Sequence, residues 1–247
     1  IDIHAGGEDL VFPHHENEIA QSEAANGKPF ARYWMHNAFL NIDNKKMSKS
    51  AGNFFTVRDI VAKYDPQVVR FFMLSAHYRS PLNFSDELME AAKNGLDRIR
   101  TAVTNLNFLL EKAEDREKTQ EEIKLLEEAA GFAAKFDEAM DDDLNTADAI
   151  AAIFELVKFI NTNSSADNSA AYIRELLNEI KELSDVCGLI VEKKEEMLDS
   201  SVEALIEERQ AARKAKNFAR ADEIRDELLA KGIILEDTRE GVKWKRA

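Results

Sequence analysis

The chain has 247 residues, a formal net charge of −14 at pH 7 and one cysteine. This length allows a sizeable hydrophobic core in one large domain or in several small ones. The acidic total argues against a general nucleic-acid coat protein, because phosphate neutralisation needs clustered Lys and Arg. Cys187 alone cannot form an internal disulfide and fits a reducing compartment. Because no apolar run approaches the roughly 20 residues of a membrane span and no signal-like segment opens the chain, we predict cytoplasmic localisation and no membrane partner.

The first part of the chain mixes strand-like runs with short helices. Residues 1–55 alternate strand-like segments, such as residues 39–42, with loops, and Pro13 is suited to the first turn of a helix that ends at Gly27. From Thr56 onward the apolar spacing is helical, and Pro66 opens another short helix. Ile1 lies within a strand-like run without an initiator methionine, which indicates a fragment.

Residues 85–191 carry the pattern of an antiparallel bundle of four amphipathic helices. Ser85 and Asn145 are predicted helix starts, and Cys187 is predicted to be a packed thiol rather than a nucleophile. The side chains expected to face the core are Leu88, Ala92, Leu96, Ile99, Val103 and Leu106, then Ile123, Leu126, Ala130, Ala133 and Ala134, then Ile150, Ile153, Phe154, Val157 and Ile160, and finally Tyr172, Leu176, Ile180 and Leu183.

The tail after the charged linker 192–201 differs from the rest in charge. From Val202 it contains eleven Lys or Arg and ten Asp or Glu, so it is +1 while the remainder is −15. Two helices, the second with Phe218, Ala221, Ile224 and Leu228 on one face, and a hairpin are predicted. Cations beside an aromatic plane are typical of RNA binding, although solvated helix faces explain the helical cations equally well. The candidate residues are Arg209, Arg213, Lys214, Lys216, Arg220, Lys243, Trp244, Lys245 and Arg246.

A lysine-rich pentad, Lys46-Met47-Ser48-Lys49-Ser50, precedes Ala51-Gly52-Asn53. Two ammonium groups three residues apart in a glycine-containing loop suit a polyphosphate ligand. Taken alone, such a pentad is more simply interpreted as an exposed lysine-serine turn. The context upstream therefore decides between the two interpretations.

Two upstream segments supply that context. The stretch Gly6-Gly7-Glu8-Asp9 lets backbone approach a ligand beside a carboxylate, which suits ribose hydroxyls, although a plain turn is the favoured interpretation when the stretch is taken alone. In Phe12-Pro13-His14-His15-Glu16-Asn17-Glu18, a helix projects His14 and Glu18 from one face toward a shared ion. The same spacing, in isolation, most often makes a surface ion pair.

Two further sets of residues are interpreted as structural rather than functional. Trp34 and His36 are predicted to be core residues rather than ligands. The acidic stretch 141–146, Asp-Asp-Asp-Leu-Asn-Thr, is interpreted as a helix start, because carboxylates repel RNA phosphates.

Taken together, these segments resemble the second half of the catalytic domain of class I aminoacyl-tRNA synthetases, most closely the cysteinyl-tRNA synthetase family. The resemblance covers the whole chain and is strongest over residues 1–85, at residues 140–146 and in the last 45 residues. It implies a mostly α fold with a partial α/β, Rossmann-like nucleotide-binding half-domain, a helix bundle and a small α+β tail. The implied domains are residues 1–55 as the second half of the catalytic domain with the lysine-rich signature loop, 56–84 as a junction subdomain, 85–191 as an anticodon-binding bundle, and 202–247 as a small tRNA-binding domain.

The resemblance also implies roles for single residues. Lys46 and Lys49 are catalytic; His4, Gly7, Asp9 and Lys49 bind ATP; His14 and Glu18 are two of four zinc ligands; His15 and Glu16 are supporting residues; and Arg209, Arg213, Trp244 and Lys245 contact tRNA. The implied reaction is ATP-dependent activation of L-cysteine and its transfer to tRNA-Cys, with Mg²⁺ accompanying ATP and one Zn²⁺ per full-length subunit. Zinc favours thiolate, which separates cysteine from serine better than an apolar pocket does.

The sequence departs from the family in two respects. The other two zinc ligands of the family are cysteines that precede this segment, and the first nucleotide-binding signature is also absent, so we predict that this chain alone is inactive. Two alternatives stay open. A cysteine ligase acting on an amino sugar has little need of a basic tail with Trp244, and a non-enzymatic tRNA-binding module is favoured by the missing signature.

Overall fold

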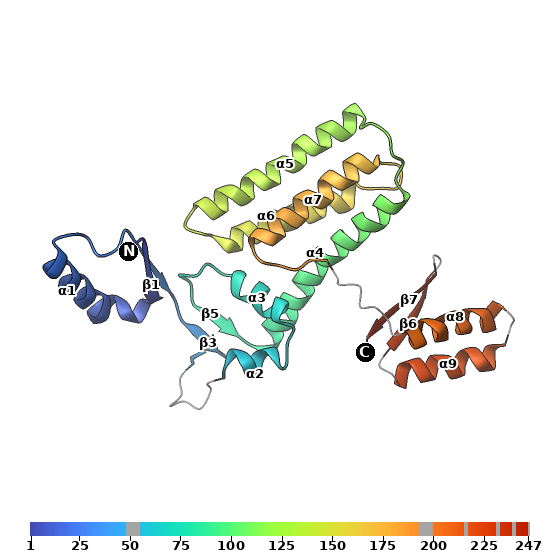
Figure 1. Cartoon of the computed structure of the whole chain (residues 1–247), viewed down its shortest axis with the longest axis horizontal. Helices are drawn as coiled ribbons and strands as arrows, with labels where there is room; N and C mark the ends of the chain where they lie inside the picture. Colours follow the sequence, from blue (N-terminus) through green and yellow to red (C-terminus); the bar gives the residue numbers. More distant parts are fainter. Residues whose placement is uncertain (48–54, 193–199, 215–216, 231–232, 239–240, 247) are drawn as a thin grey trace. The chain divides into compact units, whose positions relative to one another are not determined.

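A computed structural model describes residues 1–47, 55–192, 200–214, 217–230, 233–238 and 241–246 (Figure 1). The chain divides into two compact units, Ile1–Lys193 and Lys194–Ala247, which are described separately here. In the described residues, no helix is both long and apolar enough to cross a bilayer. The architecture is mostly helical, with small sheets in each unit.

The first unit begins with a βαβ segment. Strand β1 (Ile3–Gly7) pairs in parallel with β2 (Tyr33–Asn37), and α1 (Glu16–Asn26) connects them. The turns η1 (Glu8–Leu10) and η2 (Val11–His15) precede α1. The α-helix begins later than Pro13, because the backbone at Phe12 is extended and η2 is a π turn. The predicted end is confirmed, since Gly27 caps α1 with φ of 64°.

A second small sheet follows. Strand β3 (Leu40–Ile42) pairs antiparallel with β4 (Lys45–Lys46) and parallel with β5 (Leu82–Phe84). Between β4 and β5 lie the short helices α2 (Val57–Val61) and α3 (Pro66–Leu74). Both were predicted from their first residues: Thr56 forms a capping box with Asp59, and Pro66 occupies the first turn of α3.

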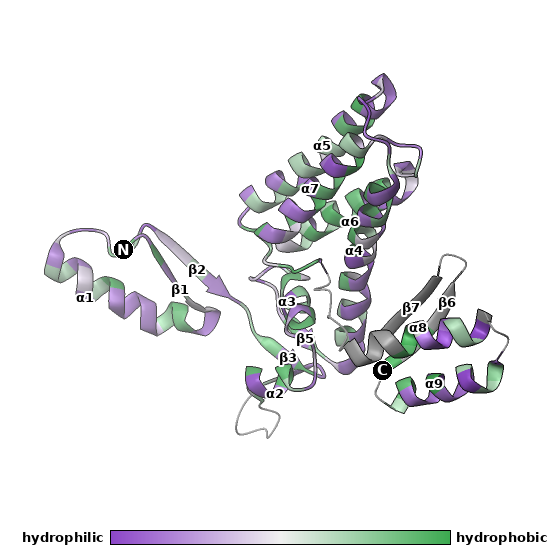
Figure 2. Ribbon diagram, turned by 45° about the vertical axis from the view of Figure 1, so that its right-hand side comes forward, coloured by the Kyte–Doolittle hydropathy of each residue, from purple (hydrophilic) through white to green (hydrophobic). Residues whose placement is uncertain are grey.

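Residues 86–186 form the predicted four-helix bundle. Its helices are α4 (Asp86–Lys112), α5 (Gln120–Asp141), α6 (Thr146–Asn163) and α7 (Ala170–Val186). The predicted starts are confirmed, because Ser85 accepts a hydrogen bond from the Leu88 amide and Asn145 accepts one from the Asp148 amide. Helix α5 packs on α6 and α4 packs on α7, and Figure 2 shows apolar residues along the faces where the helices meet.

The predicted core is confirmed for α7 and nearly so for α6, but the faces of α4 and α5 were partly wrong. Leu88, Ala130 and Ala134 are exposed. Met89 is buried in place of Leu88, and Ala129 with Phe136 marks the true inner face of α5. A shift of one residue turns a side chain by about 100° around the helix, so a one-position error reverses its burial. Cys187 is buried as predicted, and burial raises the pKa of its thiol.

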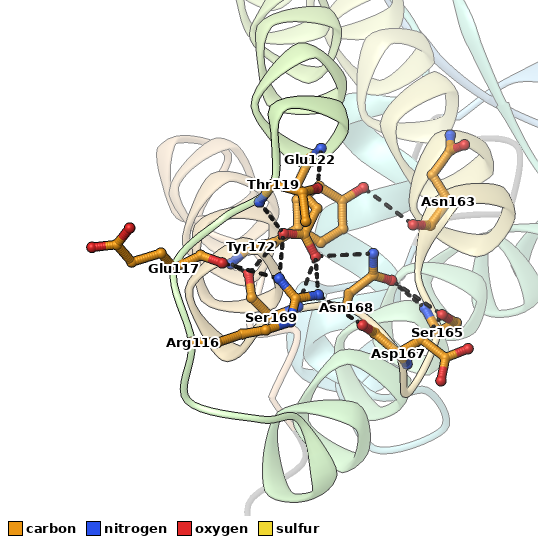
Figure 3. A network of polar contacts seen from close by, with 10 residues as sticks. All are labelled: Arg116, Glu117, Thr119, Glu122, Asn163, Ser165, Asp167, Asn168, Ser169 and Tyr172. Atoms are coloured by element: carbon orange, nitrogen blue, oxygen red, sulfur yellow. Dashed lines mark hydrogen bonds and ion pairs between the residues drawn. The ribbon is translucent and has the colours of Figure 1, made fainter.

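One buried carboxylate fastens the start of α5 to the start of α7 (Figure 3). Glu122 accepts hydrogen bonds from the Thr119 amide at 2.8 Å, from the Ser169 amide at 2.7 Å and from both terminal nitrogens of Arg116 at 3.1 Å. Asn168 also donates to it, at 3.4 Å. Burial by itself raises the pKa of Glu122, but these donors lower it to about 2.

The second unit is a helical hairpin with a β-hairpin. Helices α8 (Ser200–Lys214) and α9 (Phe218–Ala230) pack together, and β6 (Ile233–Thr238) pairs antiparallel with β7 (Gly241–Arg246). Ile224, Leu228 and Ile233 form its buried core. The predicted hairpin is confirmed. Phe218 was wrongly expected on the inner face of α9, since it is exposed.

Candidate functional site

A histidine cluster lies between β1, β2 and the start of α1. We give this name to His4, His15, Trp34 and His36. His4 on β1 is the direct partner of Trp34 on β2, and the ring centroids of His4 lie 4.7 Å from those of both Trp34 and His15. Nδ1 of His15 lies 2.8 Å from Nε2 of His36. The four rings therefore form one contiguous group.

Sequence reasoning missed this grouping. His15 was expected to have only a supporting role, and Trp34 and His36 were assigned to the core. The structure leaves Trp34 and His36 half-buried and buries His15 to 3% exposure. One signal was available: residues 34 and 36 of a strand share a face, so both face whatever the preceding strand carries beside them. The contact of His15 with this face depends on the backbone conformation of η2, which no motif in the sequence indicates.

Glu18 links the cluster to His14. Its Oε2 lies 2.6 Å from Nε2 of His4, and its Oε1 lies 3.5 Å from Nε2 of His14. The hydrogen bond with His4 lowers the pKa of Glu18, which keeps the carboxylate ionised at neutral pH. His14 in η2 and Glu18 in α1 thus lie within ion-pair distance, with the side chain of His14 61% exposed, and their role as zinc ligands stays a prediction.

Two overlapping donor sets share Glu18. One is the predicted pair with His14. The other consists of His4, His15 and Glu18, whose potential ligand atoms all lie within 4.8 Å of one another. Burial, followed by the nearby His4 and His36, lowers the pKa of His15, which favours the neutral imidazole that metals bind. Neutral imidazole and ionised carboxylate are donors that suit Zn²⁺.

The glycines of β1 bring the backbone close to this cluster. A Cβ on Gly6 would lie 2.9 Å from Cε1 of His15, and a Cβ on Gly7 would lie 2.5 Å from Oδ1 of Asp9. A larger residue at either position would therefore require a local shift of the backbone or of the contacting side chain. Asp9 is exposed and lies in η1, directly after β1, with its carboxylate against Gly7, the neighbour of the glycine that contacts His15.

The lysine-rich pentad is described only in part. Lys46 is the last residue of β4, and its backbone pairs with Asn41 of β3, but its side chain lies outside the described residues, as does all of Lys49. The chain reaches this segment from β2 through Ala38 and Phe39. The roles of Lys46 and Lys49 stay predictions.

The predicted tRNA-binding residues of the second unit differ in exposure. Arg209 on α8 is buried at 6% exposure, whereas Arg213 on the same helix is exposed. Arg220 pairs with Glu208 at 2.9 Å and with Glu223 at 3.1 Å. Trp244 and Lys245 lie in β7 opposite Leu235 and Ile234, with side chains outside the described residues.

Comparisons with known proteins agree with this architecture. Residues 1–94 match the family described as "tRNA synthetases class I (C) catalytic domain", residues 135–192 match the "DALR domain", and residues 195–244 match the "Cysteinyl-tRNA ligase anticodon binding domain". A solved ternary complex of LeuRS, tRNA and LeuAMS from Agrobacterium radiobacter K84 resembles the fold, with a TM-score of 0.58 and 18% identity over 77% of this chain and 28% of that chain. The fold is that of class I tRNA synthetases.

Curated relatives indicate which family of class I tRNA synthetases the chain resembles. A protein of Lachnospira eligens named "Cysteine--tRNA ligase" is 70% identical over all 247 residues, which are 52% of that protein. One of the same name from Lachnoclostridium phytofermentans is 62% identical over 100% of this chain and 54% of its own length. The chain thus spans about half the length of these relatives. It belongs to the cysteinyl-tRNA ligase family.

Proposed function

We propose that this chain carries one side of an adenylate-forming site together with the tRNA-binding parts of a cysteine--tRNA ligase. In the reaction, the cysteine carboxylate attacks the α-phosphate of ATP and releases pyrophosphate, which leaves cysteinyl-AMP. A hydroxyl of the terminal ribose of tRNA-Cys then takes the cysteinyl group and AMP leaves. One observation carries the proposal: of the two adjacent glycines of β1, Gly7 lies against the Asp9 carboxylate and Gly6 lies against His15, which belongs to the donor set with His4 and Glu18. A group suited to ribose therefore adjoins a group suited to a thiol-binding metal.

The chain's own residues supply hydrogen bonds and charge. Asp9 accepts hydrogen bonds from ribose hydroxyls, the backbone at Gly7 allows the nucleotide close approach, and His4 lines the same pocket. Lys46 and Lys49, with Mg²⁺, offset the charge of the triphosphate. Preorganised charge of this kind stabilises the transition state without covalent help from the protein.

The donors present fit zinc. His14 and Glu18 would hold the ion together with the two further ligands that the family resemblance implies, one Zn²⁺ per full-length subunit. When bound, zinc recognises the substrate thiolate and so selects cysteine over serine. Glu18 is ready for this role because its hydrogen bond with His4 keeps it ionised. Inactivity of the chain by itself and cytoplasmic localisation stay predictions.

A two-part assay tests the proposal. We define the joined protein as this 247-residue chain fused to the part of the Lachnospira eligens relative that lies outside the match. We expect cysteine-dependent ATP–pyrophosphate exchange and charging of tRNA-Cys by the joined protein, and neither activity by the 247-residue chain alone.

Each other outcome has a defined meaning. Robust exchange by the chain alone contradicts the claim that its site is incomplete. Exchange by the joined protein with transfer of cysteine to an amino sugar instead of tRNA favours the amino-sugar ligase. Binding of tRNA without exchange in the joined protein favours a non-enzymatic binding module.

A further inference from the structure

The loop 76–80, which joins α3 to β5, contacts the turn between α5 and α6 mainly through the carboxylate of Asp143, beside one hydrogen bond of 3.5 Å from Oγ1 of Thr146 to the carbonyl of Ala76. Oδ1 of Asp143 accepts a hydrogen bond from Oη of Tyr78 at 2.8 Å. Its Oδ2 lies 2.5 Å from Nη2 of Arg79 and 3.8 Å from Nε2 of His77. We call Asp143 and these three partners the latch. Asp143 lies 64 to 66 positions from these three partners in the sequence. The latch therefore adds a long-range polar contact between parts of the chain that also meet where α3 packs on α4 and α6.

The turn that carries Asp143 has an unusual backbone. Asp143 and Leu144 both have φ of 56°, in the left-handed region that non-glycine residues rarely adopt. Such conformations persist only where surrounding contacts hold them. The turn is held by bonds from the amides of Leu144 and Asn145 to carbonyls of α5, and it directs Asp143 at the loop. These two bonds also satisfy carbonyls at the C-terminal end of α5, as left-handed residues after a helix commonly do.

The loop is tied in turn to the strands of the candidate site. The carbonyl of Tyr78 accepts a hydrogen bond from the Ala38 amide at 2.9 Å, and the carbonyl of Phe39 accepts one from the Leu82 amide at 3.1 Å. Ala38 and Phe39 connect β2, which carries His36, to β3, which pairs with the strand of Lys46. A cavity of about 270 Å³ lies between this connector and the loop. Hydrogen bonds therefore contribute more than tight packing to the position of the loop on this side.

We infer that Asp143 is a positioning residue that holds the helix bundle in register with the strands of the adenylate-forming site. This inference rests on the proposed function, because it gives the latch the task of presenting bundle-bound tRNA to that site. The side chains of Asp143 and Arg79 are 39% and 63% exposed. Exposed ion pairs contribute little to global stability, so positioning of the loop explains the latch better than stabilisation of the fold does.

Three variants separate the parts of the latch. Asp143→Asn keeps the size and the tolerance of left-handed backbone but removes the charge that holds Arg79. Asp143→Gly keeps the backbone accessible and removes the side chain. Tyr78→Phe removes one hydrogen bond. The matched control is Asp142→Asn, which neutralises the exposed neighbouring carboxylate.

Kinetics of the joined protein test the inference. We expect Asp143→Gly to lower kcat/KM of tRNA-Cys charging about tenfold, the size of one lost charge-assisted hydrogen bond, and the other two latch variants to lower it less. ATP–pyrophosphate exchange stays within about twofold of the unmodified protein, since exchange needs no tRNA. Loss of both activities in parallel, or an unchanged charging rate, overturns the inference.

Amide hydrogen exchange on the 247-residue chain provides a readout that needs no activity. We expect the amides of Ala38 and Leu82 to exchange faster in Asp143→Gly and to be unchanged in Asp142→Asn. Unchanged exchange at both amides in Asp143→Gly overturns the latch even where charging is impaired. If the joined protein charges no tRNA, the proposed function fails, and faster exchange at Ala38 still supports the structural link.

Discussion

Glu18 is the residue on which the candidate site depends, because it contacts both His4 and His14. The two donor sets make different predictions. We expect His14→Ala in the joined protein to lower Zn²⁺ affinity by at least 10 to 100-fold, because it removes a direct ligand, whereas His15→Ala has the smaller effect of a supporting residue. Competition with a chromophoric chelator measures both affinities. The opposite order of effects would replace His14 by His15 in the ligand set.

Lys49 is the second residue with a direct test. In the joined protein, we expect Lys49→Ala to lower kcat of ATP–pyrophosphate exchange roughly 10 to 100-fold with little change in KM for ATP, because its charge acts on the transition state. The control is Lys45→Ala, which removes an exposed lysine of β4. A rise in KM with kcat unchanged would show that Lys49 serves only ground-state binding.

At the scale of elements, Glu122 fastens α5 to the start of α7. Its pKa is about 2 in the folded chain against 4.5 as the ordinary value, so its contribution to stability is complete above pH 4.5 and is lost as the pH falls toward 2. We expect Glu122→Gln to lower the free energy of unfolding at pH 7 by about 2 kcal/mol. The deficit relative to the unmodified chain shrinks between pH 4.5 and 3.

Urea unfolding at pH 7, 4 and 3 measures this difference, with Glu121→Gln as the control because Glu121 is the exposed neighbour on the same helix. A deficit that is constant across these pH values would mean that the charge of Glu122 is not what holds α5 to α7.

The helices also show which structural features a local sequence pattern can predict. Thr56, Ser85 and Asn145 were predicted as helix starts and cap their helices, because a cap depends only on residues within one turn. The inner faces of α4 and α5 were less well predicted. Which of two adjacent apolar residues points inward is decided by the neighbouring helices, so Met89 rather than Leu88 entered the core.

At the scale of the whole molecule, the second unit is predicted to hold tRNA while the first performs the chemistry. We expect Trp244→Ala combined with Lys245→Ala to weaken the affinity for tRNA-Cys about tenfold or more, because stacking on an aromatic ring contributes about 1 to 3 kcal/mol per base. The rate of ATP–pyrophosphate exchange by the joined protein should be unaffected. Fluorescence anisotropy with labelled tRNA-Cys measures the affinity.

The control for this pair is Arg220→Gln. Its guanidinium is already paired with Glu208 and Glu223, so we expect no comparable loss of affinity. A larger loss from Arg220→Gln than from the Trp244 and Lys245 pair would move the RNA contact from the hairpin to the helices.

The sequence by itself determined the order of elements, most helix boundaries, the family and the spacing of His14 with Glu18, because these depend on neighbours within a few residues or on a recognisable string of residues. Tertiary structure alone decided that His15 meets both His4 and His36, that Arg209 is buried while Arg213 is exposed, and that Asp143 reaches loop 76–80. Each of these contacts joins residues whose separation in the chain is unrelated to their distance in space, or depends on how one element is rotated against another. The packing of whole elements sets both the distance between such residues and the rotation of one element against another, and no local sequence pattern encodes either.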